Sequence, residues 1–192
     1  VYKAGDCTCI NNYRPISVLT AISKIMEKIV CKRLTSFLDQ HNVICNSQFG
    51  FRRRHSCEQP LVLATDFIRR ALDDGEHVMG VFLDLRKAFD VVSHHILLNK
   101  LSHYGIRGLP LEWFTSYLTN RTQSVKIAST TSSERVITHG VPQGSVLGPQ
   151  LFLLYMNDLT VHSRTDNIRL FLFADDTTLL IRHRNIEDLT VL

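Results

Sequence analysis

The sequence lacks the long apolar runs and the paired cysteines that mark several classes of protein. None of its apolar runs approaches the roughly 18 residues needed to cross a bilayer, and its first residues show no charged-then-apolar signal pattern. Its five cysteines include no Cys-x-x-Cys pair, so neither a disulfide framework nor a zinc site is supported. These absences predict a protein that makes no membrane contact and works inside the cell, in the cytoplasm, the nucleus or both.

The composition is that of a globular domain, and its charge is unevenly distributed. Hydrophobic residues make up 44% of the 192 residues and charged residues 21%. Residues 1–60 contain nine Lys and Arg against four Asp and Glu, whereas residues 61–192 contain 13 against 14. A basic N-terminal part followed by a more acidic one suits a protein that holds a polyanion and metal ions. The first residue is Val rather than Met, which suggests a piece of a longer polypeptide.

Two apolar, β-prone runs, residues 168–174 and 177–181, flank Asp175 and Asp176. This pattern predicts a β-hairpin with both aspartates at its tip. Asp-Asp is a poor choice for a two-residue turn, because such turns need a positive φ and favour glycine. Adjacent carboxylates beside apolar surface repel each other, so a bound cation would stabilise them. A solvated acidic turn is the simpler alternative that these residues alone leave open.

Hydrophobic periodicity predicts the other elements. An amphipathic helix is expected over about residues 20–41, with Ile22, Ile25 and Ile29 on its buried side and Glu27 on its polar side. The remaining expected elements are helices at residues 56–75, 93–104, 109–119 and from 145–149 to about 161, a strand at 78–83, and a β-pair at 123–127 and 135–139.

Two loops have compositions suited to nucleic acid. Residues 48–55 form a basic segment with three consecutive arginines and flanking aromatic residues, which suits phosphate contact and base stacking. Residues 140–149 contain three glycines and two prolines and lead into a helix, so their backbone could approach a ligand closely. Each loop taken alone is also compatible with an ordinary turn.

Three carboxylates could converge if the strand that ends at Asp84 lies beside the hairpin of Asp175 and Asp176. Mg²⁺ prefers such hard oxygen ligands together with substrate phosphates. Two ions about 3.5–4 Å apart can stabilise the attacking and leaving oxygens of a phosphoryl transfer. Nucleotidyl transfer is therefore the leading chemistry, and a two-metal nuclease is an alternative that needs only the same carboxylates.

Five motifs occur in the order found in reverse transcriptases of non-long-terminal-repeat (LINE-like) retrotransposons, and the chain resembles that family over nearly its whole length. The motifs are Asn12-Tyr-Arg-Pro-Ile-Ser17, Gln48-Phe-Gly-Phe-Arg52, Phe82-Leu-Asp-Leu-Arg-Lys-Ala-Phe-Asp90, Gly140-Val-Pro-Gln-Gly-Ser-Val-Leu-Gly-Pro149 and Phe173-Ala-Asp-Asp176.

The resemblance implies an α+β right-hand polymerase fold with an antiparallel palm sheet packed on helices. Residues 1–75 would form a basic, fingers-like part and residues 76–192 the palm, with a helical or fingers insertion at about 93–140. The chain would be a single reverse transcriptase domain, truncated at its C-terminus and without a thumb, so its grip on a primer–template duplex should be weak.

The resemblance also implies roles for individual residues. The catalytic residues would be Asp84, Asp175 and Asp176, and these would bind two Mg²⁺ ions, or Mn²⁺ as a substitute, together with Leu85. Phe89 would exclude a ribose 2′-hydroxyl. The full implied nucleotide-binding set is Lys3, Arg14, Lys87, Ala88, Phe89, Gln143 and Gly144, and the implied nucleic-acid-binding residues are Arg52 and Arg53.

The implied activity is RNA-directed DNA polymerisation, with an RNA template, a DNA primer and deoxynucleoside triphosphates as partners. Phe173 stands where many members of the family have Tyr, which removes a hydroxyl but keeps the aromatic ring. A catalytically inactive, nucleic-acid-binding remnant of such an element is the alternative. The intact Asp84, Asp175, Asp176 and Phe89 favour the active enzyme.

Overall fold

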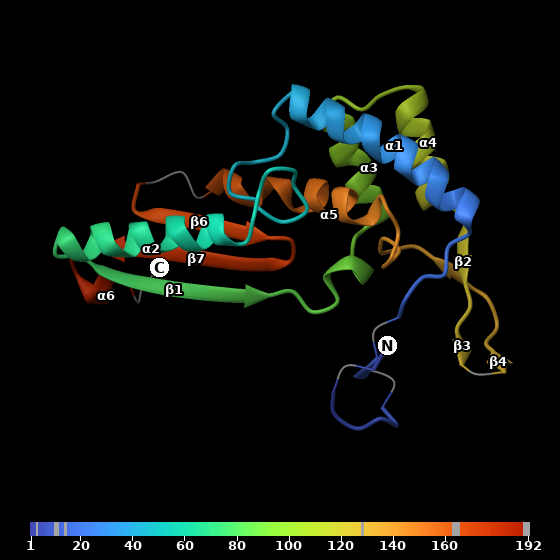
Figure 1. Cartoon of the computed structure of the whole chain (residues 1–192), viewed down its shortest axis with the longest axis horizontal. Helices are drawn as coiled ribbons and strands as arrows, with labels where there is room; N and C mark the ends of the chain where they lie inside the picture. The colour runs from blue at the N-terminus through green and yellow to red at the C-terminus, as the bar shows by residue number, and fades with distance from the viewer. Residues whose placement is uncertain (3, 10–11, 14, 128, 163–165, 190–192) are drawn as a thin grey trace. The chain divides into compact units, whose positions relative to one another are not determined.

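The computed structural model describes the chain apart from residues 3, 10–11, 14, 128, 163–165 and 190–192, which Figure 1 draws in grey, and the side chains of residues 160–162. It divides into two compact units. Unit 1 comprises Val1–Phe37 and Phe89–Tyr155, and unit 2 comprises Leu38–Ala88 and Met156–Leu192. The sequence-based division into fingers-like and palm parts stays a prediction. No described helix is long and apolar enough to cross a membrane.

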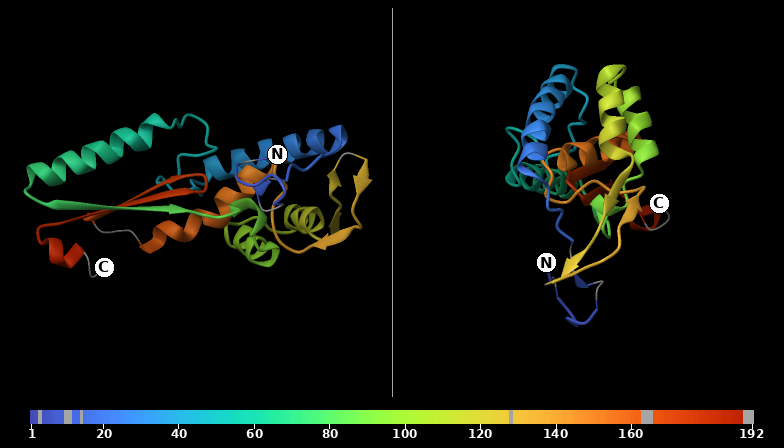
Figure 2. Two further views of the ribbon diagram at one scale, coloured as in Figure 1. Left: turned by 90° about the horizontal axis from the view of Figure 1, so that it is seen from below. Right: turned by 90° about the vertical axis from the view of Figure 1, so that its right-hand side faces the viewer.

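Unit 2 is built on a three-stranded antiparallel sheet. Its strands, in the order β1-β7-β6, are β1 (His77–Asp84), β7 (Asp176–His183) and β6 (Ile168–Phe173). Helix α2 (Glu58–Asp73) lies along one face of the sheet (Figure 1, and Figure 2, left). Phe67 of α2 joins Phe49, Phe171 and Leu180 in a buried cluster, so burial of apolar side chains fixes the helix on the sheet. The short helices η3 (Asn157–His162) and α6 (Ile186–Leu189) complete this unit.

The hairpin of β6 and β7 turns one residue earlier than the sequence predicts. Phe173 pairs with Asp176, so Ala174 and Asp175 are the two turn residues. Asp176 is the first residue of β7 and pairs with Asp84 of β1. The positive φ that a two-residue turn needs falls on Ala174, at +58°. The prediction that both aspartates occupy the turn is wrong for Asp176, because the ladder with β1 continues through it.

Unit 1 is mainly helical. Its helices are α1 (Ala21–Gln40, to Phe37 in this unit), α3 (His94–His103), α4 (Leu109–Leu118) and α5 (Gly148–Met156). Ser93 is the N-cap of α3, and its side chain accepts the N–H of Ile96. The β-pair predicted at 123–127 and 135–139 is only partly right. β2 (Arg121–Gln123) pairs with β5 (Arg135–Ile137), whereas β3 (Lys126–Ile127) pairs with β4 (Thr130–Thr131), which lies between the two predicted strands. The 3₁₀ turn η2 (Ala88–Asp90) follows β1 in the chain.

The buried side of α1 differs from the expected one. Ile22 is 76% exposed, Ile25 58% and Ile29 48%, whereas Glu27 is only 2% exposed. Glu27 is buried because its carboxylate accepts backbone N–H groups and a tyrosine hydroxyl inside unit 1. A hydrogen-bonded carboxylate can therefore lie on the buried side of a helix, although hydrophobic periodicity alone predicts isoleucine side chains there.

Candidate active site

The carboxylates predicted to be catalytic come from the end of β1 and from the hairpin, all within unit 2. Asp84 is the last residue of β1, and its direct cross-strand partner is Asp176 of β7. Residues directly opposite each other in an antiparallel pair have Cβ atoms about 4.5–5.5 Å apart. Asp175 precedes Asp176 in the turn. The condition for convergence, that the strand ending at Asp84 lies beside the hairpin, is therefore met.

The charges at this end of the sheet oppose folding. Asp84 and Asp176 are exposed and Asp175 is half-buried. None of the three carboxylates has a hydrogen bond or ion pair to any residue that the structure describes. Like charges directly opposite each other destabilise a β-ladder. A divalent cation fits this donor set, because Mg²⁺ and Mn²⁺ both prefer carboxylate oxygens.

The three side chains do not already surround a common point. Within the described parts of the chain, no group of three or more His, Cys, Asp or Glu side chains is placed to hold a metal ion. The backbone brings Asp84 and Asp176 together, but the convergence of all three carboxylates on one ion stays a prediction.

The segment after β1 turns sharply. Leu85 and Lys87 are exposed, whereas Ala88 is buried at the start of η2. Lys87 has a φ of +55°, which is uncommon for a residue with a side chain. The chain therefore changes direction within a few residues of Asp84. The predicted contacts of Leu85 with metal and of Lys87 and Ala88 with nucleotide are not tested by this geometry.

Unit 1 holds the other predicted nucleotide-binding residues. The ring of Phe89 is half-buried and stacks on Phe152, with 4.7 Å between centroids and 19° between planes. Gln143 Nε2 donates to Asp90 Oδ1 at 3.2 Å, and Gly144 is exposed with a φ of +94°. Asp90 thus acts as a hydrogen-bonding group that orients the Gln143 amide. The roles of Phe89, Gln143 and Gly144 towards a nucleotide stay predictions.

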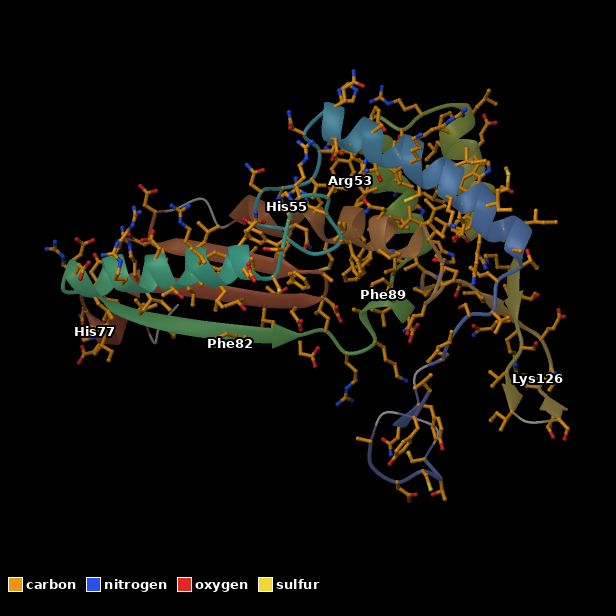
Figure 3. All side chains as sticks on the ribbon, in the orientation of Figure 1. Arg53, His55, His77, Phe82, Phe89 and Lys126 are labelled. Carbon is orange, nitrogen blue, oxygen red and sulfur yellow. The ribbon has the colours of Figure 1, made fainter. Side chains whose placement is uncertain are left out.

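In the basic loop before α2, Arg52 bonds to the loop's own backbone, whereas Arg53 is exposed. Arg52 Nη1 donates to the carbonyls of Cys45, at 2.8 Å, and Gln48, at 3.1 Å, so part of its guanidinium holds the loop together. Arg53 is exposed, and Figure 3 shows it with His55 in this loop. Lys3 and Arg14, two further predicted phosphate contacts, lie outside the described residues.

Two buried polar side chains, one in each unit, hold backbone that lies next to predicted site residues in the chain, and the motifs alone do not indicate this. Gln48 is 2% exposed and bonds the backbone of Ala174 in the hairpin turn. Glu27 accepts the N–H of Val146 at 2.6 Å, two residues after Gly144. A buried polar group must find hydrogen-bond partners, but the residue type alone does not reveal that it is buried.

Glu27 also accepts a hydrogen bond from the hydroxyl of Tyr117, at 3.0 Å. Burial, followed by the negative charge of Glu27, raises the pKa of Tyr117 to about 12. The Glu27 carboxylate thus links α1, α4 and the segment that leads into α5, all within unit 1.

Tyr117→Phe is expected to lower the free energy of unfolding by about 1.5–3 kcal/mol near neutral pH, because a hydrogen bond to a charged acceptor is lost. The pKa of Tyr117 is higher in the folded than in the unfolded chain, so the hydroxyl contributes fully below the ordinary tyrosine pKa of about 10 and loses its contribution as the pH rises to about 12. The difference between parent and variant should therefore shrink over this range. Urea unfolding at several pH values measures it, and a constant difference would contradict the link to Glu27.

Comparisons with known proteins match the chain to reverse transcriptases. The family model "Reverse transcriptase (RNA-dependent DNA polymerase)" matches residues 1–191. The RNA-directed DNA polymerase from mobile element jockey of Drosophila melanogaster is 35% identical over 97% of this chain and 21% of its own length. The probable RNA-directed DNA polymerase from transposon X-element of the same species is 38% identical over 90% of this chain and 19% of its own length. The chain thus spans about a fifth of these relatives.

A solved structure supports the same fold. Apo telomerase from Candida tropicalis, truncated from its C-terminal domain, superposes with a TM-score of 0.61 over 88% of this chain and 35% of that chain, at 13% identity. This likeness confirms the expected α+β fingers-palm architecture. The chain therefore belongs to the reverse transcriptase family.

Proposed function

We propose that the chain is the catalytic part of an RNA-directed DNA polymerase that extends a DNA primer along an RNA template, using deoxynucleoside triphosphates. One observation carries the proposal: Asp84 lies directly opposite Asp176, with Asp175 in the adjoining turn, and none of the three carboxylates has a partner among the described residues. A sheet gains no stability from opposed carboxylates, so we attribute them to chemistry.

Reverse transcriptases generally use divalent metal ions. We assign two Mg²⁺ ions, with Mn²⁺ as a substitute, to Asp84, Asp175 and Asp176, with a further contact at Leu85. When bound, the ions neutralise the triphosphate and favour ionisation of the attacking 3′-hydroxyl. The chain's own part is to hold the carboxylates on a rigid strand and turn, so that little reorganisation is needed during the reaction.

The nucleotide is assigned to the residues at the start of the η2 turn and to the loop at residues 140–149. The backbone N–H groups of Lys87 and Ala88 would donate to the triphosphate, and Gln143 and Gly144 would line the nucleotide and template pocket. The bond to Asp90 supports the assignment of Gln143, because it fixes the amide in one orientation. For Lys3 and Arg14, which lie outside the described residues, the proposed triphosphate contacts rest on the resemblance alone.

The RNA template is assigned in part to the basic loop of unit 2. Arg53 is exposed, so its guanidinium can reach a phosphate, whereas Arg52 also donates to the Cys45 and Gln48 carbonyls of the loop. Phosphate contacts of this kind add affinity without reading sequence. We therefore expect Arg53 to affect template binding more than template choice.

Phe89→Val is expected to lower the ratio of kcat/KM for deoxynucleotides over ribonucleotides by at least about tenfold, equivalent to about 1.4 kcal/mol of discrimination. The flat ring would exclude a 2′-hydroxyl by steric clash, so a smaller side chain relaxes selectivity without abolishing chemistry. Primer extension with each nucleotide type measures the ratio. Phe152→Leu, which changes the buried ring that stacks on Phe89 and keeps the Phe89 ring itself, is the control. Equal selectivity in the parent and Phe89→Val would make Phe89 a core residue.

The proposal is tested by primer extension with a longer polypeptide that includes this chain and the sequence downstream of it. An RNA template, a DNA primer, deoxynucleotides and Mg²⁺ should yield full-length complementary DNA, and omission of Mg²⁺ should abolish the product. The same protein should leave an unprimed duplex intact. Binding of the primer–template without extension would support the inactive remnant, and metal-dependent cleavage of the duplex would support the nuclease.

A further inference from the structure

Gln48 is a buried side chain whose bonds reach the catalytic turn. It is 2% exposed, and its Oε1 accepts the N–H groups of Gly50, at 2.8 Å, and Ala174, at 3.1 Å. Its Nε2 donates more weakly to the Ala174 carbonyl, at 3.5 Å. One amide therefore engages both polar backbone groups of the residue that precedes Asp175.

The backbone around Gln48 runs along the edge of β6 that does not pair with β7. Phe49 N–H donates to the Leu172 carbonyl and Leu172 N–H donates to the Ser47 carbonyl, each at 2.8 Å. Gly50 then lies against the turn so closely that a Cβ atom there would be 2.3 Å from the Ala174 nitrogen. The segment of residues 47–50 thus reaches from the edge of the sheet to the tip of the hairpin.

Ala174 is the residue in the turn that most needs support. Its φ of +58° lies in the left-handed region, which a residue with a Cβ atom rarely adopts and which glycine adopts readily. The next two residues are Asp175 and Asp176, and the backbone of the turn sets the direction of both carboxylates. If Ala174 relaxed to a negative φ, the turn would change and Asp175 would move.

We propose that Gln48 is a positioning residue for the metal-binding carboxylates: it holds Ala174 in its left-handed conformation and thereby fixes Asp175 and Asp176 relative to Asp84. This inference rests on the proposed function, since it assumes that these carboxylates bind the metal ions. Groups that hydrogen-bond a metal ligand change affinity or activity about 10–100-fold when they are lost, and Gln48 acts one residue further away, through the backbone of Ala174, so we expect the lower end of this range.

A matched control in the same unit distinguishes the positioning role of Gln48 from a purely structural one. Asn157 is another side chain whose amide bonds two backbone groups of this region, the N–H of Cys45 and the carbonyl of Val43, each at 2.8 Å. These bonds hold the start of the same loop and do not involve the hairpin turn. Asn157→Leu and Gln48→Met each replace an amide with an apolar side chain of similar size.

The test has two measurements on each variant of the 192-residue chain. Mn²⁺ binding is monitored by the electron paramagnetic resonance signal of the free ion, and stability is measured by thermal unfolding. Gln48→Met is expected to weaken Mn²⁺ binding at least about tenfold. Asn157→Leu should lower Tm to a similar extent and leave Mn²⁺ binding unchanged. In the extended polypeptide, Gln48→Met should lower kcat by a similar factor, with little change in the KM for nucleotide.

Two further variants keep the test decisive if Gln48→Met is poorly folded. Gln48→Glu keeps an oxygen that accepts the two N–H groups, so it should stay within about threefold of the parent in Mn²⁺ affinity. Ala174→Gly in the Gln48→Met background should restore much of the lost affinity, because glycine adopts a positive φ without help. A loop that merely needed Gln48 to fold would not respond to a change at residue 174.

The outcomes are distinct. If the parent binds Mn²⁺ in an Asp84-dependent manner and Gln48→Met binds it equally well, the positioning role is overturned while the proposed function stands. Equal losses of affinity in Gln48→Met and Asn157→Leu would also overturn it. If the parent shows no Asp84-dependent binding, the proposed function fails and the positioning role fails with it.

Discussion

Asp84→Asn is expected to reduce the kcat of metal-dependent primer extension by at least about 10³-fold, equivalent to about 4 kcal/mol of transition-state stabilisation. The amide keeps the shape of the side chain but loses the charge that attracts the ions. The same substitution removes the repulsion between Asp84 and Asp176, which are direct partners across the ladder. The variant should therefore lose activity while its free energy of unfolding stays constant or rises by up to about 1 kcal/mol.

This opposed pair of effects separates a functional carboxylate from a structural one. Single-turnover extension by the longer polypeptide and urea unfolding of this chain measure the two quantities. Asp175→Asn should show a comparable loss of activity. Asp73→Asn is the matched control, because it removes an exposed carboxylate of α2 that pairs with Arg69 at 2.9 Å. Extension above background by Asp84→Asn, or a large loss of stability, would refute the assignment.

Gly50→Ala is expected to have the second-largest effect, on both stability and catalysis. A Cβ atom at Gly50 would lie 2.3 Å from the nitrogen and 3.0 Å from the Cα of Ala174, so either the loop or the hairpin turn must move. Overpacking of buried backbone typically costs about 1–3 kcal/mol, and we expect the upper end of this range. Since the turn carries Asp175, the kcat of extension should also fall by at least about tenfold.

Gly75→Ala is the control for Gly50→Ala. Gly75 lies in the same unit with a φ of +72°, and apart from its chain neighbours no described residue comes within 4 Å of the position of a Cβ atom there. Its substitution should cost about 1 kcal/mol from backbone strain alone, without altering kcat. Thermal unfolding and primer extension of both variants provide the comparison. Equal effects of the two substitutions would show that the close approach of Gly50 to Ala174 is unimportant.

Much of the architecture could be predicted from local patterns. The strand that ends at Asp84 and the hairpin around Asp175 were recognisable as apolar runs of strand length, and α2 and α3 carried capping or periodic signals. The pairing of Asp84 with Asp176 could be anticipated only as a condition, because sequence spacing does not reveal which strands are neighbours.

The errors arose where a tertiary contact overrides a local preference. Glu27 looked like a solvent-facing residue of α1, but three hydrogen-bond donors inside unit 1 draw its carboxylate inwards. Asp176 looked like a turn residue, but pairing with Asp84 extends β7 by one residue. The turn then places a positive φ on Ala174, which no residue preference predicts. In each case the deciding partner is distant in the sequence.

The role of Gln48 could not be predicted from the sequence either, although Gln48 lies in one of the five motifs. The motif placed Gln48 in a basic loop, whereas the structure buries it against the hairpin turn, 126 residues away in the chain. Arg52, from the same motif, also bonds to the backbone of its own loop. A motif shared by a family can therefore mark residues that shape the site as well as residues that touch the substrate.

The measurement that tests the central proposal most directly is anomalous X-ray diffraction from crystals of the extended polypeptide with primer–template, a deoxynucleotide and Mn²⁺. We expect two anomalous peaks about 3.5–4 Å apart, with the carboxylates of Asp84, Asp175 and Asp176 among the ligands. Such peaks would locate the ions without reference to activity. Mn²⁺ bound elsewhere, with Asp84 outside its ligand shell, would contradict the assignment of these carboxylates to catalysis.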